Sequence, residues 1–483
     1  MLRSARLVKI SCVFSKKFAK DVVLKLQDMG FVHLIKAEGA GFKAVTATNS
    51  EYDGASKLLS RTDYLIDSVE SKTLPLIRKI FGPRYISVKE TDYENIKNIG
   101  KKLQELETKY RGSKNKAKVN ISDYNQLFLF RDILNDVMKR FQALECFSES
   151  KHNMLFEGWV GHDKAQRVKN AVELTTKNTC VFEAHLPKKD EEPPSLLENP
   201  PIIKPFEIFT ENYGLPSYRE MDPTPIIAFT FILMFGLMFS DVGYGLGLTV
   251  LSLFIYFYTT KESKLRKSIN LILIYSGLSS MFFGLLFGEF FGLHFRKGVI
   301  DPLSDIILFL LISVLIGLVH MSIGIISKII TNINKSKVWL HSISLLLIMW
   351  STFSLYYVRD ISLNKILLFT GVVILLVIKK LDAIKGLLAL VTGAISYVRI
   401  AILGVAHIVV NRMLILSYHN LSGNILEVAL FVVLFGIGSF IVLILGVFIS
   451  YIQTLRLHWI EFFSQFYEGK GYEFKPFNHN ITL

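Results

Sequence analysis

Apolar residues are distributed in two regimes along the 483 residues of the chain. Residues 1–224 mix charged and apolar positions as soluble domains do, whereas long apolar runs separated by short charged gaps recur from Pro225 to Leu457. Runs of this length are typical of helices that cross a bilayer. The pattern predicts a cytosolic head over residues 1–190, a linker over 191–224, a membrane domain over 225–459 and a cytosolic tail over 460–483.

The head repeats one short pattern. Strand-like, helix-like and strand-like segments occupy residues 5–10, 15–29 and 31–35, and again residues 154–160, 163–177 and 178–184. We therefore expect two small α/β lobes, residues 1–48 and 151–187. Residues 51–150 are charged and rich in Leu, Ile and Lys, which favours a hairpin of two long helices between the lobes over an irregular helical domain.

The membrane domain divides into apolar runs that could each cross a bilayer. They cover residues 226–240, 242–258, 269–291, 304–331, 338–358, 364–378, 386–417 and 428–457. The first two could also form one long tilted helix. With a cytosolic head and about eight spans, however, the Lys and Arg residues of the loops gather on the inner side, and one long helix would invert this bias. The chain starts without an apolar run of signal-peptide length, so we expect head and carboxyl terminus in the cytosol.

The last two runs are unusually long, and no proline interrupts the chain between Pro302 and Pro476. A helix of about 30 residues is about 45 Å long, whereas the hydrocarbon core is about 30 Å thick. We expect both helices to be strongly tilted. The predicted fold class is an α-helical polytopic membrane domain with an α/β head.

Composition narrows the classes of function. The formal charge is +14, but the excess is shared between the head and the loops of the membrane domain, so nucleic acid is not an expected partner. Cys12, Cys146 and Cys180 match neither a zinc pattern nor a disulfide framework. Without a Walker loop, H-E-x-x-H or G-x-S-x-G motif, we expect no nucleotide site, no cofactor and no metal, and the energy source is a partner or a gradient.

One arginine lies deep within the seventh run. Arg399, in GAISYVRIAILGVAHIVV, is about 20 Å along its helix, too deep for easy snorkelling. A charge there is costly and should face a water cavity or a partner carboxylate. A guanidinium keeps its proton where a buried lysine loses it, so Arg399 would favour the ionised form of a passing carboxylate and block an ionic short circuit. Structural pairing with a partner's helix is the alternative.

Four ordered motifs resemble a known family. They are MDPTPIIAFTFILMFGLMFSDVGYG (221–245), GLLFGEFFG (284–292), SYVRIAILGVAH (396–407) and YIQTLRLHWIEFFSQFYEGKGYEFKPF (451–477). Together they resemble the membrane stator subunit of rotary V/A-type (vacuolar/archaeal-type) ATPases, subunit a or subunit I. The resemblance implies two aqueous half-channels beside a rotating ring of proteolipid subunits. It also implies a head that ties the membrane part to peripheral stalks and to the ATPase sector.

The resemblance also assigns residues. Arg399 matches the essential arginine of the family, and Arg456 matches a second arginine in the last span, although its place near the inner helix end also suits snorkelling. His407, eight residues after Arg399, either lines the path or hydrogen-bonds within the core. Some relatives carry a glutamate ten positions before the second arginine, where this chain has Gly446.

Three acidic residues lie within or at the ends of the apolar runs. Glu289 is the candidate for the ion path. Asp241 is expected in a hairpin bend, and Glu427 at a helix start, where its charge favours the helix dipole. We interpret Arg412, near the outer end of its run, as a snorkelling anchor.

Two functions compete. The favoured one is a rotary-motor stator that carries H+ or Na+ while partner subunits hydrolyse or make ATP. The alternative is a stand-alone secondary transporter whose Arg399 binds an anionic solute, which should show internal repeats and broken helices at the midplane. No convincing repeat is visible. A plain membrane anchor explains the head but not a deep arginine.

Overall fold

The computed structural model describes most of the chain in two compact units. The described residues are 5–37, 39, 41–45, 50–73, 96–111, 121–188, 190–259, 264–295, 298–333, 335–357, 361–379, 383–416 and 425–479. The head unit comprises Ala5–Leu196 together with the chain from Tyr472 onward, and the helical unit comprises Leu197–Gly471. Each unit is described by itself.

One antiparallel β-sheet forms the centre of the head unit. Strand β1 (Leu7–Ser15) pairs antiparallel with β5 (Asn153–Gly161) on one side and with β6 (Val181–His185) on the other. The remaining strands are β2 (Val32–Ile35), β3 (Lys43–Ala44) and β4 (Ser148–Glu149), and the order is β3-β4-β5-β1-β6 with β2 also on β5. Helices α1 (Ala19–Met29) and α6 (Ala165–Thr175) contribute to the same core as alternate residues of β1.

The two lobes predicted from the sequence are therefore one domain. The pairing of β1 with β5 runs from Leu7↔Gly161 to Ser15↔Asn153 and joins residues from both predicted lobes. A lobe of two strands and one helix would leave long strand edges unpaired and bury too few apolar side chains to be stable alone. Combining both halves satisfies these edges and gives a single core.

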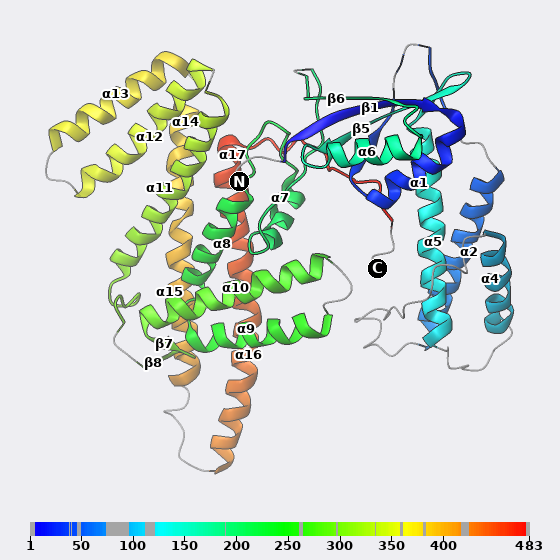
Figure 1. Cartoon of the computed structure of the whole chain (residues 1–483). Helices are drawn as coiled ribbons and strands as arrows, with labels where there is room; N and C mark the ends of the chain where they lie inside the picture. Colours follow the sequence, from blue (N-terminus) through cyan, green and yellow to red (C-terminus); the bar gives the residue numbers. More distant parts are fainter. Residues whose placement is uncertain are drawn as a thin grey trace. The chain divides into compact units, whose positions relative to one another are not determined.

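The helical part of the head contains more than a hairpin of two helices. Its described helices are α2 (Ser50–Thr73), α4 (Ile96–Arg111) and α5 (Ile121–Glu145). They lie side by side around buried residues such as Leu65, Leu103 and Phe130 (Figure 1). Residues 74–95 and 112–120 of the predicted hairpin lie outside the described residues.

The chain returns to the head unit after the helical unit. Phe477 N–H donates to the Val32 carbonyl at 2.8 Å, and the Phe477 side chain is buried in the head core. Because the head unit holds both Leu196 and Tyr472, a helical unit that crosses a bilayer must cross it an even number of times. One long helix in place of the first two predicted spans would give an odd number.

The helical unit has apolar helices at all eight predicted positions. They are α8 (Thr224–Met238), α9 (Val242–Thr259), α10 (Lys264–Phe287), α11 (Ile306–Thr331), α12 (Ser336–Tyr357), α13 (Ile361–Lys379), α14 (Ala383–Ser396) with α15 (Val398–Leu416), and α16 (Ile425–Arg456). Within the described parts of the chain, five stretches are long and apolar enough to cross a membrane, and α8, α9 and α13 are shorter. The number of crossings stays a prediction.

Two predicted segments differ from expectation. The seventh run is not one continuous helix, because Tyr397 separates α14 from α15. The predicted linker, residues 191–224, is partly folded: it contains α7 (Glu207–Tyr213), and Phe206 and Phe209 are buried in the core of the helical unit. Aromatic side chains at these two positions bury more area than an extended linker would allow.

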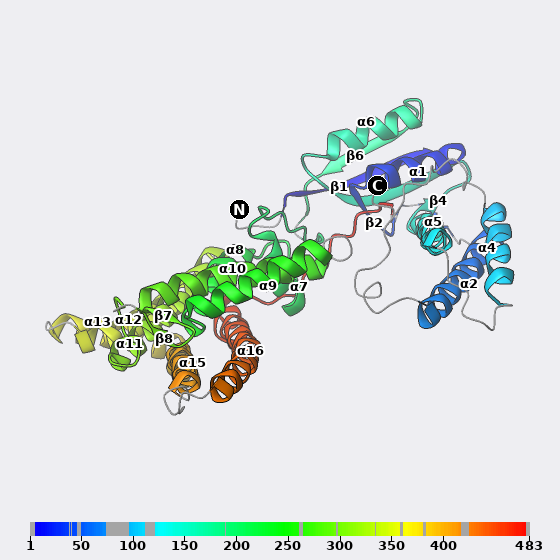
Figure 2. The same cartoon turned by 90° about the horizontal axis from the view of Figure 1, so that it is seen from below.

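The helices of this unit do not all run in one direction. The pair α9–α10 runs across α15 and α16, which appear lengthwise in Figure 1 and end-on in Figure 2. Helices that cross in this way cannot all stand along one bilayer normal. The tilt expected for the last two spans stays a prediction.

Several basic residues that set the predicted orientation fall outside the described residues. They are Lys261, Arg296, Lys297, Arg359 and Lys380.

The α16 helix continues through a π-helical segment, Leu457–Phe462, into the short helix α17 (Phe463–Phe466). A hairpin of two short strands, β7 (Glu289–Phe290) and β8 (Leu293–His294), follows α10.

His479 attaches residues 472–479 to the helices of the head unit through charged hydrogen bonds. Its two ring nitrogens lie 2.9 Å from Asp28 Oδ1 of α1 and 2.9 Å from Asp136 Oδ2 of α5. Ionised carboxylates only accept hydrogen bonds, so both nitrogens donate and the ring is an imidazolium. Burial by itself lowers the pKa of His479, but the hydrogen bonds and charges of Asp28 and Asp136 outweigh it and raise the pKa above its ordinary value. Lys139 Nζ, also on α5, donates to the Asn478 carbonyl nearby.

We expect this attachment to weaken in alkaline solution. A raised pKa in the folded state means that the stabilisation is complete below the ordinary histidine pKa and is lost as pH rises through the raised value. His479→Gln should cost about 1 kcal/mol of segment stability at pH 6 and abolish the pH dependence. Hydrogen–deuterium exchange of the amides of Phe474 and Phe477 in the full-length chain measures this. The exposed His152→Gln is the matched control, and equal protection at pH 6 and pH 9 in the wild type would contradict the expectation.

Candidate functional site

Arg399 lies at the second position of α15, directly after the break at Tyr397. Its guanidinium is half-buried, and Nη1 donates to Gln453 Oε1 on α16 at 3.3 Å. Among the described side chains, no carboxylate lies within ion-pair distance of Arg399. A neutral amide oxygen thus partners this cation, and the guanidinium keeps further donors for another group.

Gln453 is a site residue that sequence reasoning missed. It precedes Arg456 by three positions on α16, so both residues lie on one helix face. Arg456 is exposed at the last position of that helix. The signal that could have found Gln453 is the presence of an uncharged polar residue one turn before an arginine in a long apolar run.

One face of α15 and α16 carries exposed apolar side chains, and no described residue covers it. Ile402 and Met413 of α15 are 55% and 66% exposed, and Phe448 and Ile452 of α16 are 59% and 43% exposed. The most apolar window of the last candidate membrane span has no buried residue. This surface needs lipid or another apolar protein surface around it.

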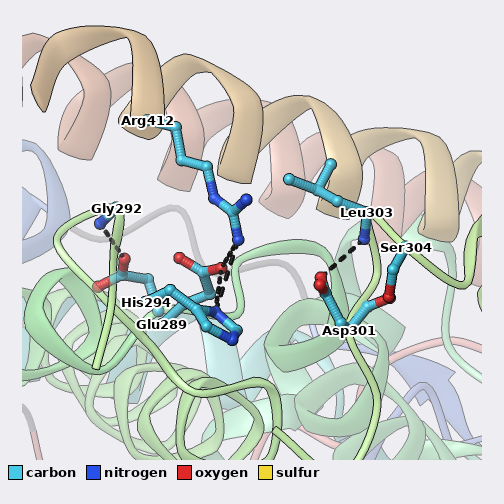
Figure 3. Close-up of polar contacts among 8 residues, drawn as sticks. Glu289, Gly292, His294, Asp301, Leu303, Ser304 and Arg412 are labelled. Carbon is cyan, nitrogen blue, oxygen red and sulfur yellow. Dashed lines mark hydrogen bonds and ion pairs between the residues drawn. The ribbon is translucent and has the colours of Figure 1, made fainter. Parts of the chain in front are cut away.

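Glu289 and Arg412 form an ion pair. Glu289, in β7, is 1% exposed, and its Oε1 lies 2.7 Å from Arg412 Nη2 of α15 and 3.2 Å from His294 Nδ1 of β8 (Figure 3). Arg412 is therefore tied to a carboxylate of its own chain, which corrects the interpretation of Arg412 as a simple snorkelling anchor. A carboxylate buried in apolar surroundings is strongly destabilised without a paired cation, more so than a lipid headgroup would be.

Asp301 adds a second negative charge near this pair. It accepts a hydrogen bond from Leu303 N–H at 3.0 Å in the loop between α10 and α11 (Figure 3). Burial would raise the pKa of Asp301, but this hydrogen bond, Ser304 and the charges of Arg412 and His294 outweigh it and lower the pKa. Asp301 therefore stays ionised at neutral pH.

Asp241 lies between α8 and α9, as expected for a bend, and is buried. Its carboxylate accepts from the N–H groups of Tyr244 at 3.0 Å, Phe291 at 3.0 Å and Gly292 at 3.1 Å. Asp241 thus caps the start of α9 and holds the β7–β8 hairpin that carries Glu289. Glu427 is the third residue of α16, at a helix start as predicted.

His407 faces the interior of the unit. Its ring packs 4.4 Å from Phe239 and 5.5 Å from Tyr244 between centroids, and Asn411 Nδ2 donates to His407 Nε2 at 3.1 Å. A Cβ at Gly446 would lie 2.5 Å from the Phe239 ring and 3.5 Å from His407 Nδ1. Phe239 and His407 therefore fill the space that a glutamate at position 446 would need. The geometry favours a core contact for His407, and a role in an ion path stays a prediction.

Comparison with known proteins identifies similar chains. A model of the V-type ATPase 116kDa subunit family matches residues 68–297 and 368–479. The A-type ATP synthase subunit I of Methanocaldococcus jannaschii is 28% identical over 464 residues, covering 84% of this chain and 67% of the relative. The protein of the same name from Pyrococcus horikoshii is 27% identical over 497 residues, covering 95% of this chain and 72% of the relative.

Removal of one partner of the Glu289–Arg412 pair should destabilise the helical unit. Arg412→Met leaves Glu289 buried without its cation, at a cost of about 2–4 kcal/mol, less than for a fully buried pair because Arg412 is 32% exposed. The double variant Arg412→Met/Glu289→Gln should recover part of the loss. Thermal unfolding of the full-length chain in lipid measures both. If the two substitutions are additive, the pair is not coupled.

Proposed function

Because the chain belongs to the V-type ATPase 116kDa subunit family, we propose that it is the membrane stator of a rotary ATPase and carries ions past Arg399. Membership makes the chain a subunit of a rotary ATPase and a membrane protein. The ion is H+ or Na+, and its movement is coupled to hydrolysis or synthesis of ATP by partner subunits. The head and residues 472–479 lie in the cytosol.

The observation that carries this proposal is the state of Arg399. Its described partner is the neutral Gln453, and the neighbouring apolar face of α15 and α16 is uncovered. A permanent cation next to an apolar surface is costly unless a counter-charge reaches it. No described residue supplies that counter-charge, and a ring of proteolipid subunits would bring one carboxylate after another to the guanidinium.

The chemistry follows from the fixed charge. A carboxyl group that is neutral, through a bound proton or a bound Na+, can move through lipid at low cost, whereas the ionised form cannot. Beside Arg399 the ionised form is favoured, so the carboxylate releases its ion there. Because the guanidinium itself does not release its proton, it separates the entry path from the exit path.

Other groups of the chain fit supporting roles. Glu289, paired with Arg412, would line the outer half-channel, with His407 as a further candidate. Arg456, one turn beyond Gln453, would contact the ring from the inner side. The head unit would join the membrane sector to peripheral stalks and to the ATPase sector. This assignment rests on the family and on the positions of these residues.

Arg399→Ala should abolish ATP-driven ion pumping while the complex still assembles. Without the cation, an arriving carboxyl group keeps its ion and passes through unexchanged. Ion uptake into vesicles that contain the purified complex measures the loss, expected to be at least about 100-fold for a preorganised charge. Arg399→Lys should retain little activity, since an ammonium in this setting can lose its proton.

Arg456→Ala is the matched control at an exposed arginine of the same face, and we expect a smaller loss of pumping. Normal pumping by assembled Arg399→Ala complexes would reject the proposal. Solute transport in liposomes by the chain without ring or stalk subunits would instead favour a stand-alone transporter.

A further inference from the structure

Two departures from regular α-helix meet at one histidine. The first is the break at Tyr397 between α14 and α15, two residues before Arg399. The second is the π-helical segment Leu457–Phe462, which begins directly after Arg456. Both pack against His320 of α11, which is 1% exposed. π-Helical turns are uncommon and often occur at functional sites, so their coincidence with the arginines needs an explanation.

Tyr397 is fixed from two sides. Its hydroxyl forms a 2.7 Å hydrogen bond with His320 Nδ1, and its ring is fully buried. Gly317, one turn before His320, provides the space: a Cβ there would lie 2.3 Å from Tyr397 Cγ. The amide of Ile400 donates to the Tyr397 carbonyl at 3.0 Å, which starts α15. The position of Tyr397 therefore sets where the helix that carries Arg399 begins.

The π-helical segment is fixed at the same place. The His458 ring lies 4.9 Å from His320 between centroids, and the Phe462 ring stacks on His320 at 4.4 Å. His458 Nδ1 donates to the Thr454 carbonyl at 2.7 Å, and His458 Nε2 hydrogen-bonds the Thr230 hydroxyl of α8 at 2.8 Å. The end of the helix that carries Arg456 is thus held by α8 and α11 together.

We propose that His320 is a positioning residue that fixes Arg399 and Arg456 relative to each other. It does so through Tyr397 on one helix and through His458 and Phe462 on the other. This inference rests on the proposed function. Near the arginines, the two helices are joined by the 3.3 Å hydrogen bond from Arg399 to Gln453, which is a flexible side chain. A buried cluster inside the unit, here called the His320 cluster, holds the backbones of both helices. It consists of Gly317, His320, Tyr397, His458 and Phe462.

A fixed position matters because a preorganised charge acts only in the right place. A displacement of about 1 Å at a reacting group can reduce a rate about 100-fold. Each arginine lies next to an interruption of regular α-helix, Arg399 two residues after Tyr397 and Arg456 directly before the π-helical segment. A buried hydrogen bond and stacked rings give these interruptions a single arrangement, and the break and the π-helical turn are then the conformations that this arrangement selects.

The test measures ions pumped per ATP hydrolysed by the assembled complex. Tyr397→Phe removes only the hydroxyl, and His320→Phe removes the hydrogen-bonding group but keeps a ring. We expect each to lower the ratio about tenfold, because ATP hydrolysis continues while carboxyl groups pass Arg399 without exchange. His320→Gln, which can still bond to Tyr397, should retain more of the ratio than His320→Phe. Ser313→Ala, which removes a buried hydroxyl on the same helix, is the control and should leave the ratio unchanged.

A second measurement is independent of pumping. Spin labels are attached at Leu388→Cys of α14 and Ile402→Cys of α15 in a chain without its native cysteines. The two positions lie on either side of the break, about 20 Å apart along the helices. Both positions are exposed, at 60% and 55%. The full-length wild type should give one narrow distance, and Tyr397→Phe and Gly317→Ala should broaden or shift it.

The outcomes separate the two proposals. An unchanged ratio and an unchanged distance in the Tyr397 and His320 variants would overturn the positioning role, even if Arg399→Ala abolishes pumping. If assembled Arg399→Ala complexes pump normally, the ion-path proposal fails, and the spin-label distance still decides whether the His320 cluster fixes the break. A parallel loss of hydrolysis and pumping with lower thermal stability, and an unchanged distance, would show a purely structural role.

Discussion

The structure of the helical unit depends on the cost of a permanent positive charge in apolar surroundings. Arg399 cannot shed its proton, and the described chain gives it only the oxygen of Gln453. The polar groups His320, Tyr397 and His458 are buried inside the unit, and the exposed face of α15 and α16 is apolar. A surface of this kind is stable only against lipid or a partner that brings its own negative charge.

Two passages of the chain connect the head unit with the helical unit. The chain passes between them after Leu196 and again before Tyr472. On the head side the two passages are hydrogen-bonded to each other, since Ser195 N–H donates to the Tyr472 carbonyl at 2.8 Å and Phe474 N–H donates to the Ser195 carbonyl at 3.1 Å. Two hydrogen-bonded passages of the chain restrict twisting more than one flexible linker would.

The sequence predicts the parts of this fold that depend on local pattern. Apolar runs placed the eight helical positions, and the depth of Arg399 identified its unusual cost. Contacts between distant segments were not predictable in this way. The pairing of β1 with β5, the return of Phe477 to the head core and the bond between Tyr397 and His320 each join residues far apart in sequence. Periodicity describes one face of one element and contains no information about which distant element covers it.

The contrast between two arginines of α15 shows what the sequence could not separate. Arg399 and Arg412 both lie in one apolar run, and from the sequence Arg412 differs only by its place nearer a helix end. In the fold, the β7–β8 hairpin brings Glu289 to Arg412, so this charge is compensated within the chain. The hairpin is in turn held by Asp241, which lies 48 positions earlier than Glu289 and binds the N–H groups of Phe291 and Gly292. Compensation within the chain makes Arg412 part of the scaffold, whereas no described carboxylate compensates the charge of Arg399.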